Sequence, residues 1–120
     1  MIRRCLILAA LLATSACQRT HDANLQSLGD PKLGLIMITR EGCGSCHEIP
    51  GVVDADGEAG PPLTHFARRT LIAGVLPNTP SNLVLWLKTP QSVVPENAMP
   101  NMGLSDAQAK DVAAYLYTIK

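Results

Sequence analysis

The stretch Cys43-Gly44-Ser45-Cys46-His47 decides how the rest of this 120-residue chain is interpreted. Two cysteines separated by two residues can each form a thioether with one vinyl group of a haem, and the histidine that follows then lies beneath the iron as an axial ligand. The pattern C-x-x-C-H therefore predicts one covalently attached c-type haem, held by Cys43, Cys46 and His47.

Two other uses of paired cysteines fit the sequence less well. A structural zinc site needs a second pair of Cys or His ligands, and the remaining cysteines, Cys5 and Cys17, lie in an N-terminal segment that we expect to be removed or modified. A thioredoxin-like redox pair belongs beside a strand–helix–strand pattern, which the sequence lacks. Haem attachment is therefore the favoured interpretation.

The composition bounds the class of protein. A chain of 120 residues is long enough for one small domain. Ten basic and ten acidic side chains balance, so no nucleic-acid partner is predicted. Aromatic residues make up only 3% of the chain, so few large side chains are present to fill a core. A large, flat, apolar cofactor would supply the missing volume.

The N-terminus predicts export. Residues 1–16 combine a basic start, a short apolar run and small residues, as in a signal peptide. Small residues running into Cys17 resemble a bacterial lipobox, which would place a lipid on Cys17, although Thr14 stands where that motif has an aliphatic residue. Ordinary cleavage near Ala16 is the alternative. We expect residues 17–29 to be a flexible spacer and residues 30–120 to form the domain.

Four helices are expected in that domain. Asp30-Pro31 and Thr79-Pro80 are each a capping residue followed by a proline suited to the first helical turn, and Ser105 with Gln108 forms a capping box. The predicted helices span 31–41, 63–69, 80–88 and 106–119. Residues 48–60 are expected to be a loop and 74–78 a turn. Residues 89–101, which contain three prolines and Met99, show no regular period.

Taken together, Cys43–His47, the proline-rich Met99 loop and the terminal run Val112–Leu116 resemble a class I cytochrome c over residues 30–120. The runs 60–78 and 98–105 resemble most the cytochrome domain fused to subunit II of some haem-copper oxidases, and related small stand-alone cytochromes. The resemblance implies an all-α fold of about four to five short helices around one covalent haem c. The first and last helices cross in this fold.

The resemblance also implies roles for single residues. His47 is the proximal ligand of the iron and Met99 the distal ligand, while the carbonyl of Pro61 receives the N–H of the proximal imidazole. Gly34 is the small residue at which the first and last helices cross, facing Tyr115. The aromatic residue that usually follows four positions later is Ile38 here, so we expect slightly different packing in the same fold.

Other residues compete for the distal position. Met102 lies three residues beyond Met99 and is the alternative thioether. His65 is the alternative imidazole, and bis-His ligation would lower the reduction potential relative to His/Met ligation. Asn97, Arg68 and Arg69 carry groups that could bond the haem propionates.

With both axial positions filled by protein ligands, the expected function is one-electron transfer, not catalysis. The expected partners are redox proteins of a bacterial respiratory chain, namely a terminal oxidase, a reductase or a dehydrogenase. A lipid on Cys17 would anchor the domain at the periplasmic face of the membrane, and without it the domain would be free in the periplasm. Two alternatives stay open: a haem enzyme or ligand sensor in which Met99 is displaced, and a permanent electron-entry subunit of an oxidoreductase complex.

Overall fold

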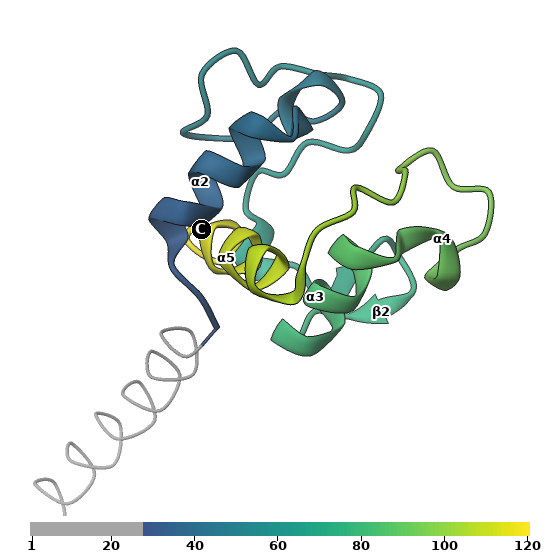
Figure 1. Ribbon diagram of the computed structural model, residues 1–120. Helices are drawn as coiled ribbons and strands as arrows, with labels where there is room; N and C mark the ends of the chain where they lie inside the picture. The colour runs from purple at the N-terminus through teal and green to yellow at the C-terminus, as the bar shows by residue number, and fades with distance from the viewer. Residues whose placement is uncertain (1–27) are drawn as a thin grey trace, which may run out of the picture.

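The computed structural model describes residues 28–120 (Figure 1). The predicted signal peptide, the predicted lipid site at Cys17 and most of the predicted spacer lie outside the described residues. In the described part no helix is both long enough and apolar enough to cross a membrane. The elements in chain order are α2 (Pro31–Arg40), η1 (Cys43–Ser45), η2 (Phe66–Arg68), β1 (Leu71–Ile72), β2 (Leu76–Pro77), α3 (Pro80–Lys88), α4 (Pro90–Val93) and α5 (Asp106–Leu116).

Residues next to helix α2 determine where it begins and ends. The side chain of Asp30 accepts a hydrogen bond of 2.8 Å from the Lys32 N–H, and Pro31 occupies the first turn. Gly42 follows the helix with φ of 68°, a left-handed conformation that suits glycine and turns the chain into η1. The predicted helix over 31–41 is confirmed to within one residue.

Helix α5 begins with both bonds of the predicted capping box. The Ser105 N–H donates to Oε1 of Gln108 over 2.9 Å, and the Gln108 N–H donates to the Ser105 hydroxyl over 3.3 Å. The helix ends at Leu116, three residues earlier than predicted. The end tightens because the Thr118 N–H and hydroxyl both donate to the Tyr115 carbonyl, at 2.8 and 2.6 Å.

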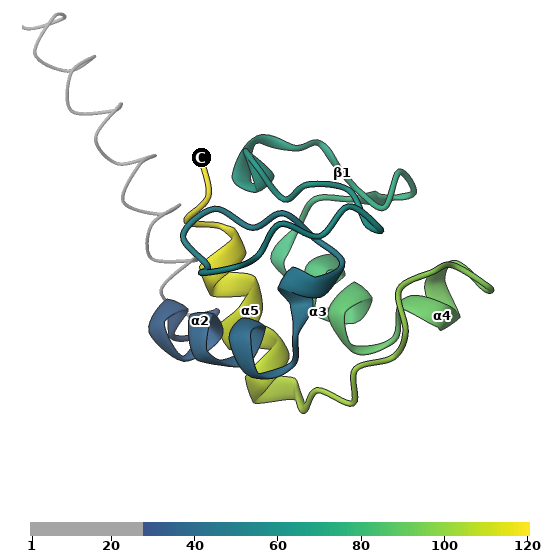
Figure 2. The same cartoon turned by 90° about the horizontal axis from the view of Figure 1, so that it is seen from above.

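The first and last helices of the described chain cross closely, as predicted (Figure 2). Gly34 is buried at this crossing, where an added Cβ would fall on the Asp111 carbonyl and lie 3.0 Å from the Tyr115 Cβ. The Asp111 carboxylate also accepts the Asp30 N–H over 2.8 Å. Ile38, at 1% exposure, fills the position where an aromatic residue was expected, so the fold tolerates the smaller side chain.

Helix α3 has the predicted bounds and carries Leu83 and Leu87 on its buried face. The side chain of Thr79 caps its start by accepting the Asn82 N–H over 3.3 Å. The predicted helix 63–69 is shorter than expected. Only η2 forms, because His65 at φ of 54° interrupts the helical conformation.

Two elements were not predicted. Strands β1 and β2 pair antiparallel around Ala73 and Gly74, whose φ values of 50° and 74° are left-handed. Such two-residue strands are too short to show an alternating pattern. Helix α4 is a single turn that starts at Pro90, where a proline costs no hydrogen bond, so the expectation of irregular chain over 89–101 was wrong at its start.

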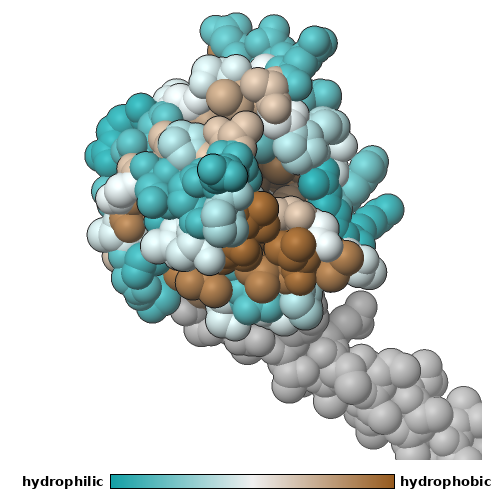
Figure 3. Space-filling model, turned by 90° about the vertical axis from the view of Figure 1, so that its right-hand side faces the viewer, coloured by the Kyte–Doolittle hydropathy of each residue, from teal (hydrophilic) through white to brown (hydrophobic). Residues whose placement is uncertain are grey.

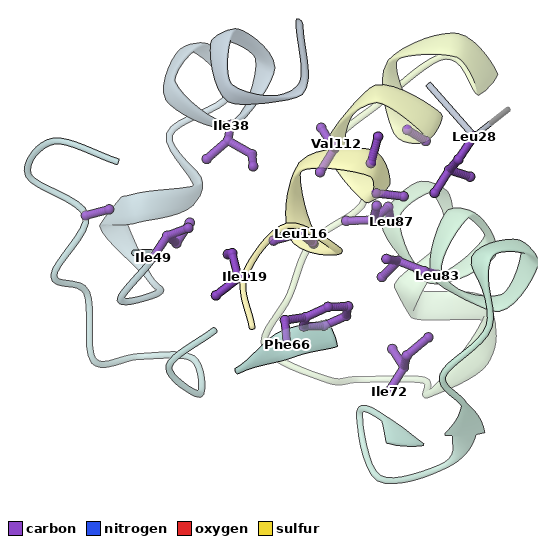
Figure 4. Packing of buried hydrophobic residues seen from close by; sticks show 14 residues of the cluster. Leu28, Ile38, Ile49, Phe66, Ile72, Leu83, Leu87, Val112, Leu116 and Ile119 are labelled. Atoms are coloured by element: carbon purple, nitrogen blue, oxygen red, sulfur yellow. The ribbon is translucent and has the colours of Figure 1, made fainter. Parts of the chain in front are cut away.

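The apolar core lies between α5, α2 and α3 and is closed by residues of the connecting segments (Figure 4). Its members include Ile38, Leu83, Val112, Leu116, Phe66, Ile72 and Ile49. No polar or charged residue of the described chain is buried. The predicted all-α architecture with crossing terminal helices is confirmed, apart from the small hairpin.

Candidate functional site

The C-x-x-C-H segment folds as the turn η1, directly after the left-handed Gly42. The Ser45 hydroxyl donates to the Gly42 carbonyl over 2.7 Å, and the His47 N–H donates to the Cys43 carbonyl over 3.1 Å. These bonds present both cysteines and the histidine from one compact turn. Neither thiol is in a disulfide, and Cys46 is exposed while Cys43 is half-buried.

The surroundings of the Cys43 thiol favour its protonated form. Burial raises its pKa above the ordinary value, and the negative charges of Glu41 and Cys46 act in the same direction, while a backbone hydrogen bond partly opposes them. Redox-active C-x-x-C pairs need the opposite, a nucleophilic cysteine with a lowered pKa. The thioredoxin-like alternative therefore loses support.

The imidazole of His47 is oriented by the main chain. Its Nδ1 lies 2.8 Å from the Pro61 carbonyl oxygen. Because a carbonyl only accepts, Nδ1 must carry the proton, and Nε2 of the neutral ring is left with a free electron pair. A hydrogen bond of this kind fixes the tautomer and orientation of a metal-binding histidine.

Gly60 leaves room for that ring. A Cβ at this position would lie 2.7 Å from Nδ1 and 2.9 Å from Nε2 of His47, closer than side chains pack. The Gly60 N–H donates to the Cys46 carbonyl over 2.6 Å, which pins the segment across the motif. The predicted Gly60-Pro61 turn therefore packs directly on the histidine.

The loop between the motif and Gly60 folds back onto η1. The Gly57 N–H donates to the Gly44 carbonyl over 3.0 Å, and a Cβ on Gly44 would lie 2.6 Å from that of Ala55. Although the loop is acidic, residues 28–120 contain no group of three His, Cys, Asp or Glu side chains that could hold a metal ion.

Met99 belongs to the segment that joins α4 to α5, and in Figure 1 that segment turns back at the end of the molecule away from α2. Its side chain is half-buried and packs against the core. Met102 is also half-buried but is not among the side chains that pack against this core. The choice of Met99 over Met102 as the distal ligand stays a prediction from the sequence.

Side-chain amides hold the main chain of Met99. Asn97 accepts the Met99 N–H at its Oδ1 over 2.8 Å, and Gln91 donates from Nε2 to the Met99 carbonyl over 2.8 Å. The role of Gln91 was missed at the level of sequence, and Asn97 was noted only as a group that could bond a haem propionate. The signal in the sequence was that amide side chains and prolines occur together in this segment. Because prolines have no N–H to donate, side-chain amides are needed to hydrogen-bond the loop.

Other residues singled out in the sequence bond elsewhere. His65 places Nδ1 3.0 Å from the main-chain oxygen of Lys120. Arg69 donates to the carbonyls of Pro62 and Thr64, the latter over 3.1 Å, and its guanidinium lies over the Phe66 ring. Both side chains therefore hold the segment that follows the Gly60-Pro61 turn.

The donor set fits a covalently attached haem. Two unpaired thiols on one turn match its two vinyl groups, and the free Nε2 of His47 is a nitrogen donor. The half-buried Met99 carries a thioether sulfur that could serve as a further ligand. The face of the molecule that carries α3 and α4 shows a contiguous apolar area bordered by polar residues (Figure 3).

Comparison with known proteins gives a consistent picture. The family model described as cytochrome c matches residues 10–120. The chain is 35% identical over 88 residues to cytochrome c oxidase subunit 2 of Alkalihalophilus pseudofirmus, covering 72% of this chain and 25% of that protein. It is 33% identical over 93 residues to the subunit 2 of Bacillus subtilis, covering 74% and 26%. The corresponding protein of Bacillus strain PS3 is 32% identical over 87 residues, covering 69% and 24%.

The chain thus spans about a quarter of the length of these curated relatives. No solved structure matches it.

Proposed function

Because the chain belongs to the cytochrome c family, we propose that it is a one-electron carrier of a bacterial respiratory chain, with one covalent haem c bound through His47 and Met99. The family carries covalently attached haem and transfers electrons. When bound, the haem supplies an iron that takes up and releases single electrons. The observation that carries the proposal is the bond between Nδ1 of His47 and the Pro61 carbonyl.

In this proposal each residue has one task. Cys43 and Cys46 form the thioethers, His47 binds the iron through Nε2, and Pro61 orients the imidazole and raises its basicity. Met99 supplies a sulfur ligand, which favours the ferrous state and raises the reduction potential. Because both axial positions are filled from this chain, no position is left for a substrate, and the protein transfers electrons without catalysing a reaction.

The proposed setting is the outer side of a bacterial membrane. Residues 1–16 would be removed as a signal peptide and Cys17 acylated. Residues 17–29 would then link the lipid to the domain formed by residues 30–120. Similarity to three oxidase subunits supports a terminal oxidase as one redox partner. A lipid anchor would confine the search for that partner to the membrane surface.

A second candidate is a permanent electron-entry subunit of an oxidase complex. It is favoured by the relatives, each of which is an oxidase subunit, and by exposed hydrophobic side chains such as Leu71, Val75 and Leu85. Stable co-purification with a membrane oxidase after detergent extraction would support the subunit. Recovery as a free monomer would support the shuttle.

The decisive experiment is an optical spectrum of the purified holoprotein, ferric and ferrous, with and without carbon monoxide. A closed site predicts low-spin iron, a ferric methionine–iron charge-transfer band and no reaction with carbon monoxide. The band should be lost in Met99→Ala and retained in Met102→Ala. High-spin iron or prompt carbon monoxide binding would instead mean an open distal position, as in a haem enzyme or ligand sensor.

A further inference from the structure

The loop that carries Met99 lacks the usual means of holding its shape. Residues 94–104 belong to neither helix nor strand, and Pro95 and Pro100 have no N–H to donate. Glu96 adopts φ of 61°, a left-handed conformation that is unfavourable for a residue with a Cβ. Some other interaction must therefore maintain this conformation.

Gln91, on α4, bonds the loop at three points with one amide group. Its Oε1 accepts the Glu96 N–H over 3.1 Å, which supports the left-handed residue. Its Nε2 donates to the carbonyls of Asn97 and Met99, each over 2.8 Å. Both amide protons and the oxygen of Gln91 are used, so the side chain is fully engaged with the loop.

Asn97 completes the arrangement from within the loop. Its Nδ2 donates to the carbonyls of Pro90 and Val94, over 3.1 and 2.6 Å, and its Oδ1 accepts the Met99 N–H. Consequently the N–H and the carbonyl of Met99 are both held by side-chain amides that are anchored on α4. These six bonds of Gln91 and Asn97 are called the amide clamp below.

We propose that Gln91 and Asn97 are positioning residues that hold the main chain of Met99 and so keep its thioether at the distal iron position. The inference rests on the proposed function, because it takes Met99 as the ligand. The clamp restricts the backbone on both sides of the ligand, so fewer conformations compete with the bound one. Exogenous ligands must break this restriction to displace the sulfur.

The test compares Gln91→Leu, Gln91→Glu and the control Gln108→Leu as ferric holoproteins. Leucine removes the whole amide, whereas glutamate keeps the size and the acceptor but loses both donors. Gln108→Leu removes a side-chain bond to the main chain of α5, outside the clamp. The measurements are the methionine–iron band, the affinity for imidazole and the unfolding midpoint in denaturant.

Both Gln91 variants should bind imidazole about tenfold more tightly and show a weaker methionine–iron band, since the loop that carries Met99 loses two hydrogen bonds in Gln91→Glu and three in Gln91→Leu. The control should lower the unfolding midpoint without changing imidazole affinity. If the Gln91 variants lower only the midpoint, then Gln91 is merely structural and the inference is overturned. A wild-type protein without the band would instead contradict the proposed function itself.

Amide hydrogen exchange in the wild-type ferrous protein keeps the inference testable if the variants do not assemble. The Glu96 and Met99 amide protons should exchange slowly, although they lie outside helices and strands. Rapid exchange of both protons would show that the clamp does not hold in solution and would overturn the proposal.

Discussion

The histidine side of the site is held by main-chain groups, whereas the methionine side is held by side-chain amides. The imidazole of His47 is hydrogen-bonded to the Pro61 carbonyl. The adjoining turn is closed by a backbone hydrogen bond from the Gly60 N–H to the Cys46 carbonyl. Met99 has its N–H and carbonyl bonded to Asn97 and Gln91. The two sides therefore respond differently to mutation.

On the histidine side the sensitive positions are glycines, because the His47 ring or a neighbouring segment occupies the space that a side chain would need. On the methionine side the sensitive positions are long polar residues, and each can be replaced by another side chain of similar size. We therefore expect single substitutions on the histidine side to prevent haem binding, and single substitutions on the methionine side to weaken the hold on Met99 only in part.

The largest effect is expected for Gly60→Ala, which breaks the histidine side directly. The added Cβ would lie within 2.9 Å of three ring atoms of His47, so either the ring or the 60–61 turn must move. Haem content per purified chain should fall to a small fraction of the wild-type value. The exposed neighbour offers the control Ala59→Ser, which should incorporate haem normally, and full incorporation in Gly60→Ala would contradict the account.

Gly34→Ala should have the next largest effect, through the helix crossing that supports η1. Alanine favours an isolated helix by about 1 kcal/mol, but overpacking against the Asp111 carbonyl costs roughly 1–3 kcal/mol. Denaturant unfolding should show a net destabilisation, whereas Lys32→Ala on the exposed face of α2 should be nearly neutral. A more stable Gly34→Ala variant would mean that the crossing is looser than described.

Tyr115→Phe tests one of the side-chain hydrogen bonds on the histidine side. The Tyr115 hydroxyl donates to the Pro50 carbonyl over 2.8 Å and so ties α5 to the loop after the motif. Its loss should cost about 1 kcal/mol of unfolding free energy. Imidazole affinity should stay at the wild-type value, because the amide clamp is untouched. A tenfold change in imidazole affinity would show that the two sides are coupled.

The smallest effect is expected for Asp106→Asn, which lies outside both sides. The pKa of Asp106 is lowered by hydrogen bonds from Lys110 first and from Lys88 second, so the charged form stabilises the fold. That contribution is present above the ordinary carboxyl pKa of 3.8 and is lost as the pH falls below it. Thermal melts should show a small difference from wild type at pH 7 that vanishes at low pH or in high salt, because the pair is exposed.

The parts of the fold that were predictable depend on short-range signals. The capping residues Asp30, Thr79 and Ser105 marked three helix starts, and each side chain accepts the predicted bond. Gly34 indicated a helix crossing because a glycine inside a helix is unfavourable unless packing requires it. Each of these features depends only on residues that are neighbours in the sequence or on one close contact, so the sequence alone can indicate it.

The rest depends on contacts that no local pattern encodes. The amide of Gln91 reaches residues five to eight positions away along a loop without periodicity, so its partners follow from the folded path alone. Helix α4 and the β1–β2 hairpin are too short to have a measurable period. The histidine side was thus largely predictable, while the support of Met99 was not.

The most direct test of this account is a proton NMR spectrum of the ferrous holoprotein with methyl-labelled methionine. A methionine bound to the iron lies over the haem ring, whose ring current shifts its methyl resonance strongly upfield. We expect one such resonance, which disappears in Met99→Leu and is retained in Met102→Leu. If no methyl is shifted, or if the shifted methyl disappears in Met102→Leu, then Met99 is not the distal ligand and the amide clamp serves another purpose.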